Sequence, residues 1–509
     1  MSLALDLDRA RALYQEIELF AAHVRKNTLG TIPIPQVGGK LSSLRGDLKN
    51  EIDLLQKRCA EDATGTQPSK GRSGSNLLFF ETLWDAAKRS SNLFDIRHRI
   101  CTQKLDKPLL APGQRIIPSL GTHMGSKYRH SLVDLITDNG RTWVKISTIT
   151  NKRLLYDLAK EAVFCDDSDE DGPTGYTIED DLDIPILKTA KELARAATNH
   201  RIRTKPPAVH LVLPRIRLGE NVEVDKIIDL CRQIPGLEVF CRDDVKPPPE
   251  LSESTMALMY PNPRASFSGL LNIDTSVIVA LTSEFSHTNV TVEDWFDRQR
   301  LAHCEQEEKE NFLERQVYPI IGGYELVCVQ EAIETYKHIV DTIGTPGERA
   351  RAKIVLGEDS SKTPAQLLEE LQKWSVHPVP TSLRLPVRVV NIESDLQGLP
   401  PQAKVVLENQ LNPGRSVFTY GWAKKLTTVT CNGVATKQLA HGLEKFSERD
   451  GTTLDDEIWP SMWAFSSSRP LLGVPKSAGW RKKHIGNCEA NGCTCGVEKF
   501  HPDTNVAAG

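Results

Sequence analysis

The sequence lacks any apolar run long enough to cross a bilayer. The longest runs, such as Val277–Thr282, fall far short of the roughly 20 residues that a transmembrane helix needs. The N-terminal stretch MSLALDLDRA carries acidic residues in place of the basic region that opens a signal peptide. We therefore expect no signal peptide and no membrane partner, and we expect a cytoplasmic or nuclear protein.

The sequence also lacks a dense cysteine pattern and an excess of positive charge. The 509 residues include 11 cysteines, and most of these stand singly inside apolar stretches, as Cys231 and Cys328 do. In a reducing compartment such cysteines are typical of a protein core and not of disulfides. The formal net charge is −4 at pH 7, which argues against a general nucleic-acid coat, because neutralising phosphate requires a strongly basic surface. A local basic groove is still compatible with this charge.

The N-terminal part of the chain shows the period of amphipathic helices. Apolar residues recur every three or four positions in two stretches, at Leu13, Ile17, Phe20 and Val24 and again at Leu41, Leu44, Leu48, Ile52 and Leu55. The segment between them, TLGTIPIPQVGGK, is rich in residues that break helices. This pattern predicts a helical hairpin, whose apolar faces either pack on their own domain or pair with helices of a protein partner.

An α/β unit is expected after the hairpin. Leu132–Ile136 and Thr142–Ile146 have the character of strands, and the Asn139-Gly140 pair between them favours a hairpin turn. Alternating helices and strands then predict a parallel sheet, at Ile186–Ala197, Ala208–Leu213, Val224–Ile234 and Leu237–Phe240. We place this N-terminal domain at residues 1–242, with flexible insertions near 63–76 and 166–183, followed by a Pro-rich linker at 243–264.

One carboxylate stands inside an apolar segment in the C-terminal half. Leu270–Ala280 reads LLNIDTSVIVA, and we expect a strand of a parallel sheet that is buried on both faces. A buried carboxylate such as Asp274 needs a cation or several hydrogen-bond donors. It is therefore expected to bind Mg²⁺ or Mn²⁺, or to cap the following turn or helix, with Thr275 and Ser276 assisting.

Three strings of this sequence resemble the DUF1308 family, a eukaryotic family of proteins of unknown function. They are Asn139–Lys145, Leu271–Ala280 and Asp341–Ala350, and the hairpin ending at Gly39-Lys40-Leu41 fits the same family. The string NIDTSVIVAL also resembles the opening strand of PIN-domain nucleases. The resemblance implies a PIN-like three-layer domain with a parallel sheet at residues 265–450. It also implies descent from metal-dependent RNA endonucleases.

A PIN nuclease gathers several carboxylates at the carboxyl edge of its sheet, because one carboxylate cannot hold a divalent ion firmly. The resemblance places Asp274 first and puts further candidates on the helix Val329–Asp341, at Glu331, Glu334 and Asp341. The last acid should end a strand in the pattern Thr-x-Asp, and we match that strand to Ser416–Trp422, where no acid is present. The expected Mg²⁺ or Mn²⁺ site is therefore eroded, and cleavage should be weak or absent.

Four residues are candidates for contacts with RNA. Tyr420 and Trp422 are expected either to stack on bases or, for Trp422, to pack under a loop. Arg349 and Lys353 share a helix face that either meets phosphate or is simply solvated. The predicted function is an RNA-associated PIN-like protein with weak or no cleavage. The alternative is a non-catalytic scaffold that recruits protein partners through its N-terminal helices.

The C-terminal extension, residues 451–509, carries a cluster of cysteines. Cys488, Cys493 and Cys495 are followed by His501, and these residues together supply enough ligands for a tetrahedral Zn²⁺ site. The alternative is a tail whose cysteines cluster by chance.

Overall fold

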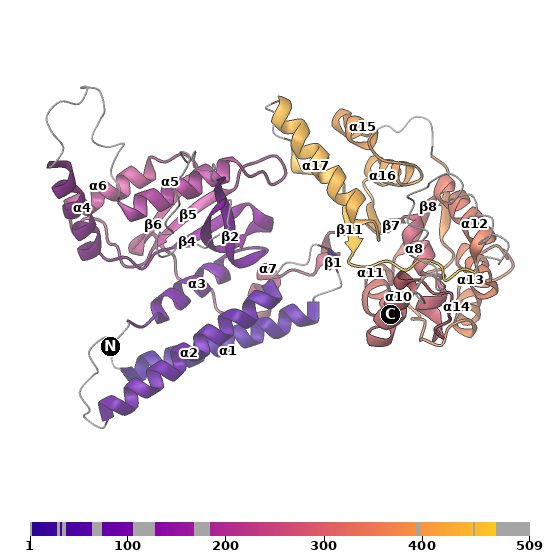
Figure 1. The fold of residues 1–509 in the computed structure, drawn as a ribbon, viewed down its shortest axis with the longest axis horizontal. Helices are drawn as coiled ribbons and strands as arrows, with labels where there is room; N and C mark the ends of the chain where they lie inside the picture. Colours follow the sequence, from indigo (N-terminus) through magenta and orange to yellow (C-terminus); the bar gives the residue numbers. More distant parts are fainter. Residues whose placement is uncertain are drawn as a thin grey trace, which may run out of the picture. The chain divides into compact units, whose positions relative to one another are not determined.

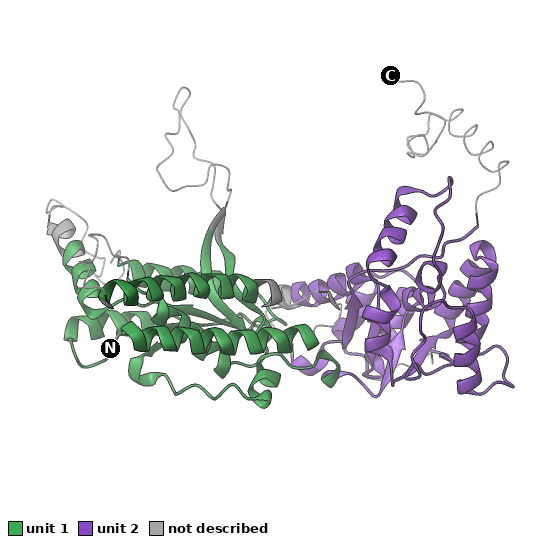
Figure 2. Ribbon diagram, turned by 90° about the horizontal axis from the view of Figure 1, so that it is seen from below, with its two compact units in different colours: residues 1–28, 34–265, 447–454 green, residues 29–33, 266–446, 455–509 purple. Residues whose placement is uncertain are grey.

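The computed structural model describes residues 3–27, 31–32, 37–63, 74–104, 128–166, 184–392, 398–450 and 454–474. The chain divides into two compact units (Figure 2). Unit 1 comprises residues 1–28, 34–265 and 447–454, and unit 2 comprises residues 29–33, 266–446 and 455–509. Each unit combines one sheet with helices, which confirms the mixed α/β class. None of the helices in the described ranges is both long and apolar enough to span a membrane.

Unit 1 opens with the predicted helical hairpin. It consists of α1 (Leu3–Asn27) and α2 (Val37–Ala63). The apolar positions that predicted these helices are buried in one core with α3 (Leu77–Arg89) and the adjoining sheet, among them Leu13, Ile17, Phe20, Leu44 and Leu48. The hairpin therefore packs on its own unit, and the face that a partner helix would need is already covered.

The sheet of unit 1 has the strand order β2-β3-β4-β5-β6. Strands β2, β3 and β4 pair antiparallel, whereas β4, β5 and β6 pair parallel. Their bounds are Asp95–Lys104, Tyr128–Thr137, Thr142–Ile146, Ala208–Leu213 and Leu237–Cys241. The predicted turn between β3 and β4 is a 3-10 segment in which Asn139 adopts the left-handed conformation, with φ 56°. Both the predicted hairpin and the predicted parallel pair are confirmed.

Four further helices of unit 1 complete its layers. They are α4 (Asn151–Asp166), α5 (Pro185–Thr198), α6 (Val222–Arg232) and α7 (Glu253–Met259). Helix α7 lies within the segment 243–264, which was expected to be a linker, and Met259 is fully buried in the core around the hairpin. Most of the two expected insertions, residues 64–73 and 167–183, lies outside the described residues.

The sheet of unit 2 is parallel apart from one short edge strand. Its order is β1-β11-β10-β7-β8-β9, and only β1 pairs antiparallel. The bounds of these strands, in chain order, are Thr31–Ile32 (β1), Leu270–Ile273 (β7), Glu325–Val329 (β8), Arg388–Val390 (β9), Thr427–Thr430 (β10) and Met462–Phe465 (β11). From β7 the chain builds outward through β8 and β9, and then returns to add β10 and β11 on the other side of β7. The winding of the sheet therefore reverses between the neighbouring strands β7 and β10. Open α/β sheets bind ligands at such a point, outside the carboxyl ends of the strands.

Helices surround this sheet (Figure 1). In chain order they are α8 (Thr275–Ala280), α9 (Glu284–His287), α10 (Arg298–Lys309), α11 (Tyr318–Ile321), α12 (Gln330–Ile343), α13 (Pro346–Leu356), α14 (Pro364–Lys373), α15 (Pro401–Leu407), α16 (Gly414–Ala423) and α17 (Gly433–Asp450). Helix α13 begins with the capping box of Thr345 and Glu348.

The predictions of two strands in unit 2 are wrong. The strand expected at Leu270–Ala280 ends at Ile273, and Thr275–Ala280 forms α8 instead. A continuous apolar run fits a buried helix as well as a buried strand, and the carboxylate of Asp274 caps the helix. The segment Ser416–Trp422, expected to end a strand, lies inside α16. The strand beside β7 is the later β10.

Candidate functional site

The carboxyl ends of β7, β8 and β10 open onto one edge of the sheet of unit 2. Asp274 follows β7 directly, Gln330 follows β8, and Cys431 follows β10. Because these strands are parallel neighbours, the residues that follow them gather at the edge. We therefore take this edge, with Asp274 at the reversal of the winding, as the candidate site.

Asp274 is held entirely by donors of its own chain. Its Oδ1 accepts hydrogen bonds from the backbone N–H groups of Ser276 (2.9 Å) and Val277 (3.2 Å) and from the Ser276 hydroxyl. Its Oδ2 accepts a hydrogen bond from the hydroxyl of Thr430 on β10. Of the two roles weighed for this carboxylate, the geometry matches the helix cap.

Asp274 is buried, with only 7% of its surface exposed. Burial raises the pKa of this carboxyl, and the hydrogen bonds from Ser276 and Thr430 oppose that rise. Burial together with the nearby charge of Asp274 also raises the pKa of the Cys431 thiol, to about 12, so this cysteine is not an activated nucleophile. The site thus favours neutral groups.

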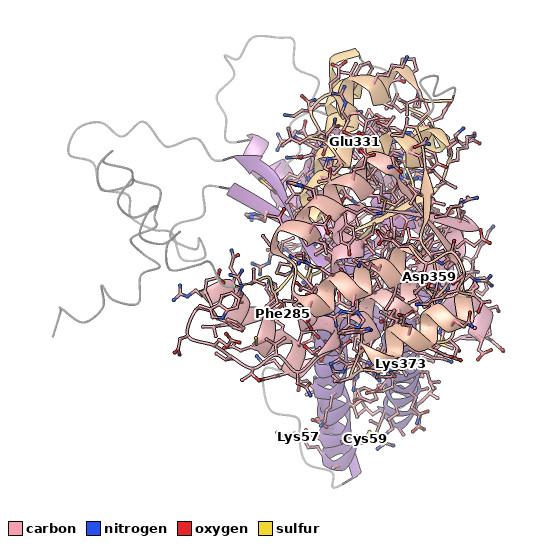
Figure 3. All side chains as sticks on the ribbon, turned by 90° about the vertical axis from the view of Figure 1, so that its right-hand side faces the viewer. Lys57, Cys59, Phe285, Glu331, Asp359 and Lys373 are labelled. Atoms are coloured by element: carbon pink, nitrogen blue, oxygen red, sulfur yellow. The ribbon has the colours of Figure 1, made fainter. Side chains whose placement is uncertain are left out.

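The other predicted acids do not assemble around Asp274. Glu331 is half-buried at the start of α12, where it accepts a hydrogen bond from the Ser416 hydroxyl on α16 (Figure 3 labels Glu331). Glu334 is exposed and accepts a hydrogen bond from Gln330 at 2.7 Å. Asp341 is exposed near the opposite end of α12. In the described part of the chain, no three His, Cys, Asp or Glu side chains are arranged to hold a metal ion.

The two aromatic candidates lie on α16. Trp422 is only 6% exposed, and its indole N–H donates to the carbonyl of Ile458 at 2.7 Å. Its ring therefore packs in the core and offers no face to a base. Tyr420 is half-buried against the main apolar cluster of unit 2.

The two basic candidates lie on α13. Both Arg349 and Lys353 are exposed. The guanidinium of Arg349 donates to the backbone carbonyl of Asp341 at 2.9 Å, so it satisfies the carboxyl end of α12. Lys353 has no such bond to α12, and its role as a phosphate contact stays a prediction.

The sequence interpretation missed the residues that follow β10. The backbone N–H of Asn432 donates to the Thr430 hydroxyl at 2.8 Å, and its side-chain oxygen accepts from the N–H of Ala435 at 3.1 Å, near the start of α17. Thr430-Cys431-Asn432 is a Thr-x-Asn string at the end of a strand beside β7. This string, and not Ser416–Trp422, matches the Thr-x-Asp pattern that was expected at the end of the last strand. It has an amide, Asn432, in place of the final carboxylate.

The cysteines of the described residues are all free. Burial raises the pKa of Cys231 and of Cys241 to about 11, as befits core residues. The proposed zinc ligands Cys488, Cys493, Cys495 and His501 lie outside the described residues.

Residues 271–371 match a family model described as "Protein of unknown function (DUF1308)". This match confirms the family resemblance for the segment that holds β7, Asp274 and α12. No curated protein and no solved structure matches the chain.

Proposed function

We propose, starting from the match of residues 271–371 to the DUF1308 family model, that this chain is a PIN-like protein that associates with RNA and cleaves it weakly or not at all. The observation that carries the second half of this proposal is the environment of Asp274. Both of its carboxylate oxygens already accept hydrogen bonds from the chain, and the strand end beside it supplies Thr430 and Asn432.

These donors do not fit a catalytic Mg²⁺ or Mn²⁺ ion. Such an ion needs several oxygen ligands, of which more than one is usually a carboxylate. At this edge Asp274 and Glu331 each accept a hydroxyl hydrogen, from Thr430 and from Ser416. A metal would have to displace both hydroxyls, so we derive no metal-dependent step from the site.

Association with RNA is supported by the way the helices begin at this edge. Helix α12 starts directly after β8, and α17 starts three residues after Thr430, the end of β10, and directly after Asn432. Helix N-termini present unpaired N–H groups and a partial positive charge, which favour phosphate. Glu331, Glu334 and Asp341 do not gather around Asp274. The edge therefore repels a polyanion less than a nuclease site would after losing its metal.

The alternative, a scaffold for protein partners, has less support. The apolar face of the N-terminal hairpin is buried in the core of unit 1. Leu5 and Leu19 are the large apolar residues of α1 that are strongly exposed, at 49% and 61%. Apolar residues scattered singly on a surface are ordinary and do not form a docking face.

Two measurements test the proposal. Filter binding of single-stranded RNA across a salt series should show retention at low salt that falls as salt rises. Incubation of the same RNA with Mn²⁺ should give little or no cleavage, and Asp274→Asn should not change it, because asparagine caps helices as well as aspartate does. Failure to retain RNA at the lowest salt would refute the association. Robust Mn²⁺-dependent cleavage that Asp274→Asn abolishes would refute the eroded site.

The zinc proposal for the C-terminal extension is tested separately. We propose that Cys488, Cys493, Cys495 and His501 bind Zn²⁺, and the metal content of the purified protein measures this directly. About one zinc ion per chain, lost when Cys493 and Cys495 are replaced by serine, is the expected result. A metal-free protein purified without chelators would contradict it.

A further inference from the structure

The positive charge of unit 2 is concentrated in its last helices. Residues 401–446 contain six basic residues but only two acidic ones, Glu408 and Glu444; the basic residues are Lys404, Arg415, Lys424, Lys425, Lys437 and Lys445. All of these basic side chains are exposed. None of them takes part in a salt bridge between described residues, whereas Lys337, Lys362 and Arg351 of the same unit do.

Helix α17 carries part of this charge as a single stripe. Lys437, His441 and Lys445 follow one another at intervals of four residues and are all exposed. On the other side of the helix Leu439 and Leu443 are fully buried. Packing therefore fixes the direction in which the stripe points, and its two lysines are separated by about 12 Å along the axis.

The three helices α15, α16 and α17 lie close to one another (Figure 1). Helix α17 approaches α15 so closely that a Cβ added to Gly442 would lie 2.8 Å from Cγ1 of Val406. The side chains of Gln410 and Gln438 are hydrogen bonded at 3.2 Å. Lys404 is exposed on α15, two residues from Val406, and it adds its charge to the basic region of these helices.

This surface begins at the edge that holds Asp274. Helix α17 starts one residue after Asn432, and Ser416 of α16 is hydrogen bonded to Glu331 at the start of α12. Val434, in the first turn of α17, is 66% exposed. A chain that contacts the edge can therefore continue onto the exposed apolar and basic side chains of α17.

From these observations we infer that the exposed face of α15–α17, with Lys404, Lys437 and Lys445 as its central cations, binds the phosphates of single-stranded RNA. The inference rests on the proposed function and deepens it, because it moves the RNA contact from α13 to α15–α17. Unpaired, exposed lysines on a rigid face release counterions when phosphate binds, and this release is the main source of affinity for a polyanion. The packed core beneath α17 supplies that rigidity.

The test compares two triple variants that remove the same charge. The first replaces the central cations, as Lys404→Gln, Lys437→Gln and Lys445→Gln. The second replaces exposed cations outside these helices, as Lys309→Gln on α10, Lys373→Gln on α14 and Arg384→Gln before β9; Lys373 lies well apart from Glu331 in Figure 3. Glutamine keeps the helix propensity of lysine, and matching thermal unfolding midpoints establish that both variants are folded.

Binding of a fluorescein-labelled oligouridylate to the full-length protein is the readout. Each lost contact should reduce the slope of log affinity against log salt by about 0.7, so the first variant should lose about 2 units of slope and bind on the order of 30- to 100-fold more weakly near 0.1 M salt. The second variant should bind as the wild type does. If the first variant does not fold, Lys437→Gln and Lys445→Gln alone should each weaken binding about 5-fold.

Several outcomes would overturn the inference. If the wild type binds RNA and both triple variants weaken equally, charge in general and not this face is responsible, while the proposed function stands. The same conclusion holds if the first variant binds like the wild type. If polyglutamate competes as well as the RNA does, the face is a site for acidic peptides and the assignment to RNA fails. If the wild type binds no RNA, the inference falls together with the proposed function.

Discussion

Thr430 donates a hydrogen bond to the carboxylate of Asp274 across the pair of strands β7 and β10. The two residues are 156 positions apart in the sequence, and they meet where the winding of the sheet reverses. The same hydroxyl accepts a hydrogen bond from the N–H of Asn432. A threonine thus ties the buried acid, the end of β10 and the start of α17 together.

Replacing Thr430 with valine should destabilise unit 2. Valine has the same shape but leaves the buried Oδ2 of Asp274 without its partner, and it removes the hydroxyl that accepts from the N–H of Asn432. An unsatisfied buried polar group costs about 1–3 kcal/mol, and we expect a loss in this range in urea unfolding. Thr342→Val is the matched control, because this exposed hydroxyl bonds only within α12. Equal midpoints for the two variants would contradict the role assigned to Thr430.

His287 should make the protein sensitive to acid. It is fully buried, its Nε2 bonds to the carbonyl of Leu281 at 2.8 Å, and burial followed by the nearby charge of Arg351 lowers its pKa to about 3. The folded state therefore keeps this imidazole neutral, while the unfolded chain takes up a proton near pH 6.5. The resulting stability is complete above pH 6.5 and is lost as the pH falls toward 3, by up to about 1.4 kcal/mol per pH unit.

His287→Gln isolates this contribution, because glutamine retains an N–H donor but does not titrate. Urea unfolding of both proteins at intervals between about pH 6.5 and about pH 4 gives the difference in stability at each pH. That difference should move in favour of the variant as the pH falls. If the difference in stability between the two proteins does not change with pH, the imidazole takes up its proton as readily in the folded state as in the unfolded chain.

Sequence reasoning succeeded where the signal was local. The period of Leu13, Ile17 and Phe20 predicted the hairpin, and Asn139-Gly140 predicted the turn. Each of these patterns is read within a few residues, and the chain forms the corresponding structure within the same few residues.

It failed where the decisive interaction is distant. The run Leu270–Ala280 has the composition of a strand throughout, and the change to helix at Asp274 depends on donors from the following turn and from Thr430. The choice of Ser416–Trp422 as the last strand failed for a related reason. An apolar segment of this length is equally compatible with α16, and the indole of Trp422 meets Ile458 only in the folded unit.

In unit 1, loss of Lys145 should be severely destabilising. Asp134 is 1% exposed; its Oδ2 lies 3.2 Å from the Lys145 ammonium and accepts a hydrogen bond from the N–H of Ile146 at 2.8 Å. Burial raises the pKa of this carboxyl, and the charge of Lys145 opposes the rise. Lys145→Met removes the only cation within salt-bridge distance of Asp134 among the described residues, which should cost about 3 kcal/mol.

A double-mutant cycle separates this effect from the loss of packing. Asp134→Asn in the Lys145→Met background removes the stranded charge, so it should restore part of the lost stability. Lys226→Met serves as the control, since its pair with Glu223 is exposed and should contribute less than about 1 kcal/mol. Strictly additive losses for Lys145 and Asp134 would show that the two groups do not interact.

Glu348 should hold the C-terminal strap, residues 470–474, on unit 2. This fully buried carboxylate accepts hydrogen bonds from the N–H groups of Leu472 at 2.7 Å and Gly473 at 3.4 Å, as well as from those of Glu284 and Thr345, both at 3.0 Å. Glu348→Gln places an NH₂ group against N–H donors whichever way the amide turns, so two bonds are replaced by repulsion. We expect a loss of roughly 2–4 kcal/mol in unfolding free energy.

Hydrogen exchange shows whether that loss is centred on the strap. In Glu348→Gln the strap should open locally more often, so the amides of Leu472 and Gly473 should exchange much faster than in the wild type. The amides of β7 should still exchange slowly. Glu358→Gln is the control on the same helical region, because its ion pair with Lys337 is exposed. If both glutamine variants leave the strap equally protected, the strap is held by other contacts, such as the bond from Ser283 to the Pro470 carbonyl. The capping box of α13 would then stabilise only the start of that helix. A selective effect of Glu348→Gln would instead show that the same carboxylate also holds residues 470–474, which are distant in sequence, on unit 2.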